Sequence, residues 1–487
     1  MSEAASVLWF RSDLRLADHP ALAAAIRRGG AVVPVFVLDE QAAGRWAPGG
    51  ASRWWLHHSL AALAADIEAL GARLILRRGS AAEELASIAH EVGADMVVCS
   101  RRYEPWAICQ EGAVRERLGG AGVELKRFPG WLLMEPETLA TKAGEPYKVY
   151  TPFWRALSST IRPEKPIPRP KLIAAPRKWP RSDKLAAWNL LPRRPDWAQG
   201  FAALWQPGEA SALERLDRFI DECAANYVEH RNRPDIEGTS RLSPHLAHGE
   251  ISPRLIWWRV TSERASREGK VGDAGLETFL KELVWREFSS HLLFHFPTLP
   301  EAPFRPEFAR FPWREDRTLL RAWQRGATGF PIVDAGMREL WATGWMHNRV
   351  RMVVASFLIK DLLIPWQEGE AWFWDTLVDA DLANNAASWQ WVAGSGADAA
   401  PYFRVFNPTS QGEKFDSAGA YVRHWVGEIA KLPDDLVHRP SEADSFTLRS
   451  KGLAIPGSYP APIVDHAAAR ECALAAFKSL KSWGEEQ

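Results

Sequence analysis

The chain has 487 residues, of which 46% are hydrophobic and 25% charged, an ordinary globular composition that excludes disordered, collagen-like and low-complexity classes. Its 60 Lys and Arg balance 60 Asp and Glu, so a surface for nucleic acid has to be a local patch. The unusual count is 25 Trp, which exceeds the 21 Phe and the 7 Tyr.

Residues 7–130 alternate between strand-like and helical segments. The strand-like runs are Val7–Phe10, Ala31–Leu38, Arg73–Leu76, Met96–Cys99 and Val123–Phe128, and helical periodicity marks Trp54–Leu70 and Ala81–His90. This alternation predicts an α/β doubly wound N-terminal domain with a buried parallel sheet over residues 1–135. The turn after the first run lacks the Gly-rich fingerprint of a dinucleotide-binding fold.

Residues 136–210 are predicted to connect this domain to the next. Within them, residues 162–195 hold 8 Pro, 10 Lys or Arg and 2 acidic residues, which favours an extended surface segment. Helical patterns follow at Leu213–Val228, Pro253–Glu263, Leu276–Phe294, Arg317–Gly326, Val333–Thr343 and His347–Leu363. Residues 211–487 are therefore predicted to form a large all-α C-terminal domain.

The segment Glu237–Ser243 places Thr239, Ser240 and Arg241 directly after a glycine and before a predicted helix start. Backbone N–H groups, hydroxyls and a guanidinium in this arrangement can hold a diphosphate. A plain capping turn is the alternative.

The predicted helix at 278–294 is two-sided. Glu282, Trp285, Arg286 and Ser289 recur at helical spacing and share one stripe, while apolar residues, interrupted by Glu287, line the other side. A carboxylate beside an indole suits a planar polar ligand. The alternative is an ion pair between Glu282 and Arg286 on a solvated face.

Two later clusters combine indoles with polar side chains. Asn348, Arg349 and Met352 follow His347, for which we expect a structural role, since no second His or Cys has metal-ligand spacing. Residues 379–385 hold two Asp and two Asn and precede Trp389 and Trp391, which core filling would also explain.

Residues 305–325 contain six Arg and three acidic residues, with Trp313 and Trp323 interleaved. A basic, aromatic surface suits a phosphate backbone, and a solvated charged face is the alternative.

Taken together and in this order, the strings resemble the photolyase/cryptochrome family over nearly the whole chain. The strings are residues 8–16, 237–243, 285–288, 328–338, 346–352, 389–391 and 406–415. The resemblance implies an antenna domain followed by a helical domain that holds FAD in a U shape.

The resemblance also implies site residues. FAD contacts would come from Tyr227, Thr239, Ser240, Arg241, Leu242, Ser243, Phe279, Arg286, Asn348, Arg351, Asp379, Asp381 and Asn385. Contacts to DNA and the lesion would come from Glu282, Trp285, Arg286, Ser289, Asn348, Arg349, Met352, Trp391 and Ser410. The residues given catalytic roles are Glu282, Asn385 and the electron route Trp313, Trp366 and Trp389, with Trp341 and Trp345 as a side branch.

The implied activity is that of a deoxyribodipyrimidine photolyase, a carbon–carbon lyase. It would split cyclobutane pyrimidine dimers in DNA by electron transfer from excited reduced FAD (FADH⁻) to a flipped-out dimer. Asn348 stands where (6-4) photolyases carry His, and Asn385 where plant and insect cryptochromes typically carry Asp or Cys. Residues 54–60 and 150–155 look most like bacterial class III enzymes.

Three alternatives remain open at this stage: a cryptochrome-like blue-light photoreceptor without repair, a (6-4) photolyase, and a flavoenzyme that does not use light. We expect 5,10-methenyltetrahydrofolate as antenna, with 8-hydroxy-5-deazaflavin or none as alternatives. Trp106 and Ala107 stand where folate-type class I enzymes have an Asn-Glu pair, which argues against that binding mode.

The chain is expected to act on UV-damaged DNA as a cytoplasmic monomer, without a membrane, a metal or an obligate protein partner. No apolar run approaches the roughly 20 residues of a membrane span. The four Cys lie far apart, which argues against a zinc site or a disulfide framework. The strand-like Val7–Phe10 begins too early for a signal peptide to be expected.

Overall fold

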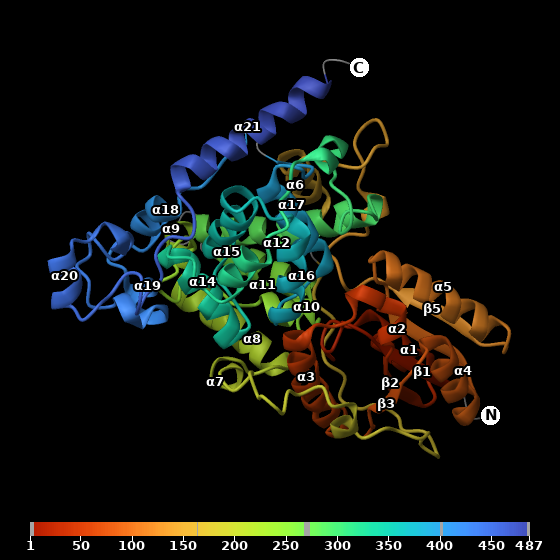
Figure 1. The fold of residues 1–487 in the computed structure, drawn as a ribbon. Coiled ribbons are helices and arrows are strands. Elements are labelled where there is room, and N and C mark those ends of the chain that lie inside the picture. Colours follow the sequence, from red (N-terminus) through yellow and green to blue (C-terminus); the bar gives the residue numbers. More distant parts are fainter. Residues whose placement is uncertain (1–3, 163, 267–272, 400–402, 485–487) are drawn as a thin grey trace. The chain divides into compact units, whose positions relative to one another are not determined.

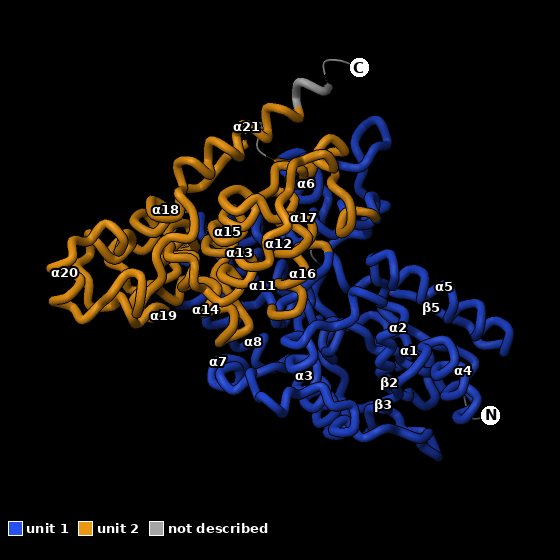
Figure 2. Tube along the Cα trace, viewed as in Figure 1, with its two compact units in different colours: residues 1–225, 240–297, 378–382 blue, residues 226–239, 298–377, 383–487 orange. Residues whose placement is uncertain are grey.

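The computed structural model describes residues 4–162, 164–266, 273–399 and 403–484, with the backbone alone for 481–484. The chain divides into two compact units, which Figure 2 colours blue and orange. Unit 1 comprises residues 1–225, 240–297 and 378–382, and unit 2 comprises residues 226–239, 298–377 and 383–487. The domain boundaries placed after residues 135 and 210 remain predictions.

Unit 1 contains a parallel five-stranded sheet of order β3-β2-β1-β4-β5 (Figure 1). Its strands are β1 (Ala5–Phe10), β2 (Val32–Leu38), β3 (Ile75–Arg78), β4 (Ala94–Ser100) and β5 (Glu124–Phe128). The register pairs Val7 of β1 with Val33 of β2 on one side and Val97 of β4 on the other. The doubly wound α/β fold is therefore confirmed.

Helices cover both faces of this sheet, because its inner strands β1 and β2 are buried along their whole length. The connecting helices are α1 (Pro20–Arg28), α2 (Glu40–Ala43), α3 (Gly50–Glu68), α4 (Ala81–Val92) and α5 (Pro105–Gly119). Leu8 and Phe10 share one core with α1 and α3, while Val7 and Trp9 share the other with α4 and α5. Successive residues of β1 thus alternate between two cores.

Strand β3 begins and ends two residues later than the apolar pattern predicts. The added residues include Arg77, whose buried guanidinium forms ion pairs with Glu84 and Glu91. A charged residue can occupy this strand because both of its carboxylate partners lie on the following helix, α4.

The Pro-rich connector at 162–195 contains, among its described residues, one 3-10 turn (Leu185–Trp188) and is otherwise irregular. It packs onto the sheet unit as well as running along the surface. Ile173, Trp188 and Leu190 are buried in the core that contains α1 and α3. The N–H of Val32 also donates to the carbonyl of Ala174 at 2.9 Å.

The remaining helices confirm the predicted all-α region. In unit 1 they are α6 (Tyr150–Thr160), α7 (Phe201–Leu204), α8 (Glu209–Arg218), α10 (Ser243–Ala247), α11 (Pro253–Ser266) and α12 (Asp273–His295). In unit 2 they are α9 (Tyr227–His230), α13 (Arg317–Gln324), α14 (Pro331–Thr343), α15 (Asn348–Ser356), α16 (Trp366–Thr376), α18 (Pro408–Phe415), α19 (Ala420–Trp425), α20 (Ser445–Ser450) and α21 (His466–Gly484). Helix α17 (Leu382–Ala393) starts on the last residue of unit 1.

Two helices predicted as continuous are interrupted. The expected helix Leu213–Val228 ends at Arg218 and continues as a π turn, Phe219–Cys223, and a 3-10 turn. The expected helix His347–Leu363 gives way to a second π turn, Phe357–Asp361. All five side chains of this turn are buried. Its two charged residues have partners, because Lys360 donates to the carbonyl of Arg404 and Asp361 pairs with His466.

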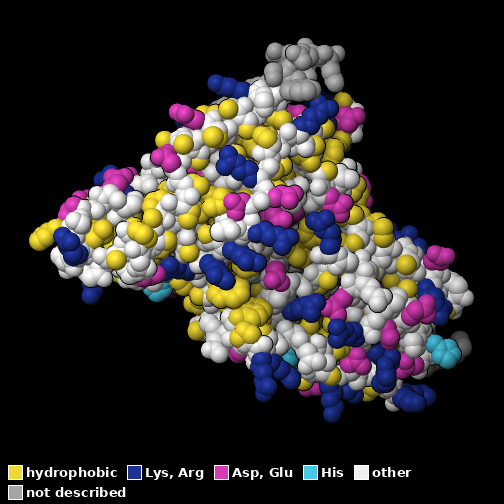
Figure 3. Space-filling model, in the orientation of Figure 1, with side chains coloured by type: hydrophobic (Ala, Val, Ile, Leu, Met, Phe, Trp, Pro, Cys, Tyr) yellow, Lys and Arg dark blue, Asp and Glu magenta, His cyan; other side chains and the backbone are white. Residues whose placement is uncertain are grey.

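Basic and acidic side chains are intermixed over the face of the molecule drawn in Figure 3. Within the described ranges, no helix has both the length and the apolar character needed to cross a membrane.

Candidate functional site

Helix α12 carries the polar stripe predicted from its spacing. Glu282 and Trp285 are half-buried, whereas Arg286 and Ser289 are buried. The indole of Trp285 lies flat on the ring of Tyr150, with ring centres 3.7 Å apart and planes 4° from parallel. Because the Tyr150 hydroxyl donates to the carbonyl of Lys281 at 2.6 Å, the stack is fixed to α12 itself.

Tyr150 is therefore a site residue that sequence reasoning missed, although its string was noted as a family resemblance. The other contacts of α12 are structural in kind. The hydroxyl of Ser289 donates to the carbonyl of Trp285 at 3.0 Å, and Phe279 packs on Phe219 with ring centres 4.4 Å apart.

Arg286 is held among backbone, indole and carboxylate. Its Nη1 donates to the carbonyl of Trp131 at 3.0 Å and lies 3.2 Å from a carboxylate oxygen of Glu287. Its guanidinium carbon lies 4.6 Å from the centre of the Trp131 ring. Nη2 is buried and, within the described part of the chain, has no hydrogen-bond partner. A buried cationic donor of this kind fits an anionic ligand.

The burial of Arg286, at 8% exposed, excludes a solvated ion pair at this position. The alternative reading of the stripe as a solvated face is therefore wrong for Arg286.

In unit 1, Ser240–Ser243 forms a strained turn into α10. Arg241 has a φ of +50°, a conformation that non-glycine residues rarely adopt. The hydroxyl of Ser240 accepts a hydrogen bond from the N–H of Leu242 at 3.4 Å, and Ser243 begins the helix.

In unit 2, Gly238, two positions before Ser240, lies against His230 of α9. Tyr227 of the same helix is buried. A Cβ at Gly238 would approach the Cβ of His230 to 2.8 Å, so this backbone requires glycine. Thr239 follows directly and is half-buried.

The two aspartates that follow Val378 lie in unit 1. Asp379 is buried and Asp381 half-buried. Burial lowers the pKa of His248 to about 4, so its ring is neutral and Nε2 can donate to the carbonyl of Val378 at 3.2 Å. This bond fixes the chain just before Asp379, and nothing in the sequence pattern indicated His248.

Helix α15 of unit 2 begins with the predicted polar cluster. His347 is its N-cap, since Nδ1 accepts a hydrogen bond from the N–H of Arg349 at 3.2 Å, which agrees with the structural role expected of it. Asn348 is exposed, and Arg349, Arg351 and Met352 are half-buried.

The guanidinium of Arg349 is oriented by several groups. Nη1 lies 3.7 Å from the sulfur of Met352, and the guanidinium carbon lies 4.4 Å from the centre of the Phe415 ring. Phe415 ends α18, on which Ser410 is exposed. Arg351 in turn donates from Nε to the carbonyl of Met346 at 2.7 Å.

Helix α17 of unit 2 fixes an amide and an indole. Nδ2 of Asn385 donates to the carbonyl of Glu370 at 2.9 Å, so its Oδ1 is the end turned away from that carbonyl. Trp389 is buried, with the ring of Phe373 at 5.0 Å and that of Trp323 at 6.3 Å. Trp391 is half-buried.

Gln390, between the two indoles, is fully buried and was not predicted. Its Nε2 donates to the carbonyls of Leu299 and Ala302, and its Oε1 accepts from the N–H of Phe304. The side chain of Gln390 therefore holds residues 299–304, the loop that follows α12. Trp389 and Trp391, its neighbours on the helix, point in other directions.

The predicted electron route lies entirely in unit 2. Trp366 is buried at the first position of α16, and one turn later Gly369 lies against the Trp389 ring. Trp313 is half-buried, and the next residue donates its N–H to the carbonyl of Leu363, three residues before Trp366. Of the three indoles, Trp366 and Trp389 are thus buried, and Trp313 is partly exposed.

One expectation for residues 305–325 is wrong. Trp323 is fully buried, and its indole N–H donates to the carbonyl of Val354 at 3.0 Å, so it belongs to the core. The basic residues Arg310, Arg314, Arg317, Arg321 and Arg325 are exposed, as predicted.

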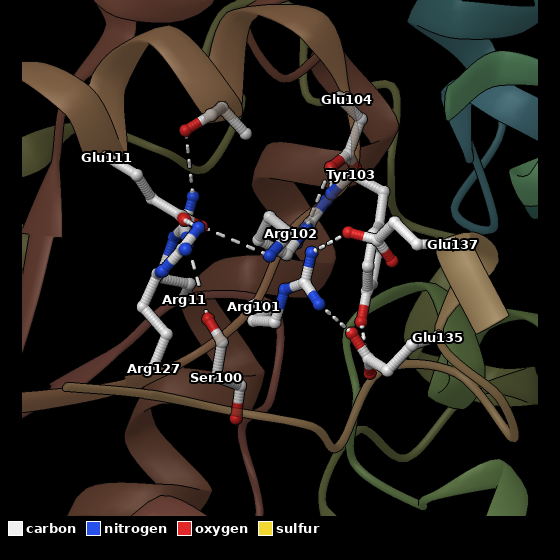
Figure 4. Close-up of polar contacts among 11 residues, drawn as sticks. Arg11, Ser100, Arg101, Arg102, Tyr103, Glu104, Glu111, Arg127, Glu135 and Glu137 are labelled. Carbon is white, nitrogen blue, oxygen red and sulfur yellow. Dashed lines mark hydrogen bonds and ion pairs between the residues drawn. The ribbon is translucent and has the colours of Figure 1, made fainter. Parts of the chain in front are cut away.

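The carboxyl edge of the sheet is filled by internal ion pairs. Strand order reverses between β1 and β4, where doubly wound folds usually bind ligands. Here Glu111 pairs with both Arg11 and Arg127, and Arg102 pairs with Glu104 (Figure 4). Figure 4 also shows Arg101 between the carboxylates of Glu135 and Glu137.

A surface pocket of about 330 Å³ lies beside α7 and α8 of unit 1. Trp205, Arg215 and Arg218 are among its lining residues. The Trp205 ring lies 5.5 Å from that of Trp55, in the string that resembles class III enzymes.

Known protein families and relatives match most of the chain. Residues 6–171 match the DNA photolyase model, and residues 279–479 match the FAD binding domain of DNA photolyase. The chain is 52% identical to the deoxyribodipyrimidine photo-lyase of Agrobacterium fabrum over 475 residues, which cover 98% of both chains. The chain belongs to the photolyase/cryptochrome family.

Other members of the photolyase/cryptochrome family are also similar. Cryptochrome-1 of Arabidopsis thaliana is 38% identical over 477 residues, covering 96% of this chain and 69% of that protein. The crystal structure of a bacterial class III photolyase from Agrobacterium tumefaciens superposes with a TM-score of 0.95 and 52% identity, covering 99% of this chain and 98% of that chain. The predicted family, fold class and likeness to class III photolyases are confirmed.

The family match supports FAD as the cofactor, and two of the predicted side chains have chemistry that fits it. In unit 1 the open Nη2 of Arg286 suits a diphosphate. In unit 2 the oriented Oδ1 of Asn385 suits an N–H donor of a reduced flavin. The individual cofactor and lesion contacts given above remain predictions.

Proposed function

We propose that this protein repairs cyclobutane pyrimidine dimers in DNA under blue light. The observation that carries the proposal is α12, which presents half-buried Glu282 and Trp285 next to Arg286 with its open donor. A rigid indole beside a carboxylate suits a flipped-out pair of bases, and the guanidinium suits the cofactor's diphosphate.

When bound, reduced FAD supplies the electron that opens the cyclobutane ring. The chain's own groups bind and orient. Arg286 would donate to the diphosphate, and Asn385 Oδ1 would accept from a flavin N–H. Glu282 and Asn348 would hydrogen-bond the flipped bases, while Trp285 would stack against them with Tyr150 behind it. The Trp285–Tyr150 stack is preformed, so little freedom is lost when the lesion enters.

DNA itself is the proposed macromolecular partner. The exposed arginines of residues 310–325 can neutralise backbone phosphates. Arg349, whose guanidinium packs on the Phe415 ring, would contact a phosphate near the lesion. The protein is proposed to act as a cytoplasmic monomer.

The deciding experiment illuminates the purified, reduced protein with an oligonucleotide that carries one thymine dimer. We expect restoration of thymines in blue light and none in the dark, measured by chromatography of the digested strand. An oligonucleotide with a (6-4) product should remain unchanged, because Asn348 stands in place of the His of that branch. Absence of light-dependent restoration would defeat the proposal and favour the photoreceptor, which the 38% identity to Cryptochrome-1 supports.

For the antenna we propose 5,10-methenyltetrahydrofolate. The ion pairs at the sheet's carboxyl edge occupy the usual ligand position there, and the pocket beside α7 and α8 combines an indole with two guanidiniums. Guanidiniums can bind the carboxylates of a folate. Mass spectrometry of pigment released from the purified protein should find folate, whereas a deazaflavin would contradict this choice.

A further inference from the structure

Glu287 is a buried carboxyl of α12 that the proposed function leaves unused. Its side chain is buried at 2% exposed. One oxygen accepts the N–H of Leu133 at 2.7 Å, and the other lies 3.2 Å from Nη1 of Arg286. All of these residues belong to unit 1.

Within the described part of the chain, the Nη2 group of Arg286 is left without a partner when these contacts are made. Nη1 serves both Glu287 and the carbonyl of Trp131, while Nη2 is buried. A second guanidinium, that of Arg102, also lies 4.3 Å from the Trp131 ring centre. An anion that binds Nη2 would therefore share the charge of Arg286 with a carboxyl group already in contact with it.

We propose that Glu287 takes up a proton when the anionic cofactor binds at Arg286, so that this carboxyl sets the pH range over which the cofactor is held. The inference rests on the proposed function in one respect, the contact between Arg286 and the FAD diphosphate. It assigns to Glu287 a positioning and charge-balancing role, without contact to the reacting atoms.

The physical basis is competition between two anions for one buried cation. Burial raises the pKa of Glu287 to about 7, and Arg286 is the main group that opposes this rise. Glu135 raises the pKa further, and Tyr103 also interacts electrostatically with Glu287. A phosphate bound at Nη2 offsets part of the positive charge of Arg286, so Arg286 stabilises the ionised form of Glu287 less. The pKa of Glu287 should therefore rise when FAD binds.

The sign of the effect follows from linkage. A group whose pKa rises on binding takes up a proton, so binding tightens as pH falls and weakens as pH rises above about 7. One proton limits the slope to about tenfold in Kd per pH unit.

The test measures FAD release from the purified holoprotein by flavin fluorescence between pH 6.0 and 8.5 at fixed ionic strength. We expect the Kd to rise about tenfold between pH 7 and 8.5, as one linked proton requires. Glu287→Gln keeps an oxygen for the N–H of Leu133 but cannot titrate, so its Kd should stay low and independent of pH. The matched control Glu137→Gln removes an exposed carboxylate that pairs with Arg101 and should keep the original profile.

A second measurement needs no variant. Calorimetry of FAD binding in two buffers of different ionisation enthalpy should show net proton uptake near pH 7.5. A pH-independent Kd, a Glu287→Gln profile that still rises, or no proton uptake would overturn the inference while leaving FAD binding intact. Failure of the unaltered protein to bind FAD at any pH would overturn the proposed function as well.

Discussion

Trp389→Phe is expected to abolish the photoreduction of oxidised FAD while sparing dimer repair by protein that has been reduced beforehand. In the predicted route Trp389 and Trp366 are buried and Trp313 is half-buried. A phenyl ring keeps the apolar contact but is much harder to oxidise than an indole. Loss of the flavin's oxidised absorption band under blue light, with an external reductant present, measures the effect.

The control is Trp425→Phe, which alters a half-buried indole of α19 and should photoreduce normally. Photoreduction that survives in Trp389→Phe would rule out this route. Residual photoreduction in Trp366→Phe but not in Trp389→Phe would instead reveal a branch, for which the exposed Trp341, stacked on Trp372 with centres 6.0 Å apart, is the candidate.

The second large effect is expected from Gly369→Ala, which should destabilise the protein by about 1–3 kcal/mol. A Cβ at Gly369 would lie 2.1 Å from the Cη2 atom of Trp389. The indole cannot move aside freely, because Phe373 and Trp323 pack against it. Chemical denaturation followed by fluorescence gives the change in unfolding free energy.

A double-mutant cycle tests the assigned cause. Phenylalanine lacks the far ring that meets the new methyl group, so Gly369→Ala should cost much less in the Trp389→Phe background, with a coupling of about 1–2 kcal/mol. Gly427→Ala is the matched control, since its Cβ would meet nothing within 4 Å, and its effect should stay within about 0.5 kcal/mol. Equal costs of Gly369→Ala in both backgrounds would contradict the steric explanation.

Local patterns were sufficient for the sheet and for the polar stripe of α12. Strands buried on both faces leave continuous apolar runs, and helical spacing alone brings Glu282, Trp285 and Arg286 onto one side. The same rules failed where a buried charge has a distant partner. Arg77 extends β3 because the two carboxylates that pair with it, Glu84 and Glu91, both lie on the next helix. Glu287 is buried because a backbone N–H and a guanidinium bind its two oxygens.

Contacts between residues far apart in the chain account for the other omissions. Tyr150 and Trp285 are separated by 135 residues (285 − 150), yet their rings stack in parallel. Trp323 follows a run of exposed arginines and has the same local surroundings as a surface indole, but it is buried against Phe373 and Trp389. No spacing rule within a short window distinguishes such an indole from one at the surface.

The division of the chain into units also bears on how the protein is made. Unit 1 contains the whole sheet and α12, but its last residues, 378–382, are made more than 150 residues after residue 225. At about 5–20 residues per second, the first part of unit 1 waits roughly 8–30 s on the ribosome for this segment. Until then the chain lacks Asp379 and the Val378 carbonyl that His248 contacts, so unit 1 is completed only when residues 378–382 have been made.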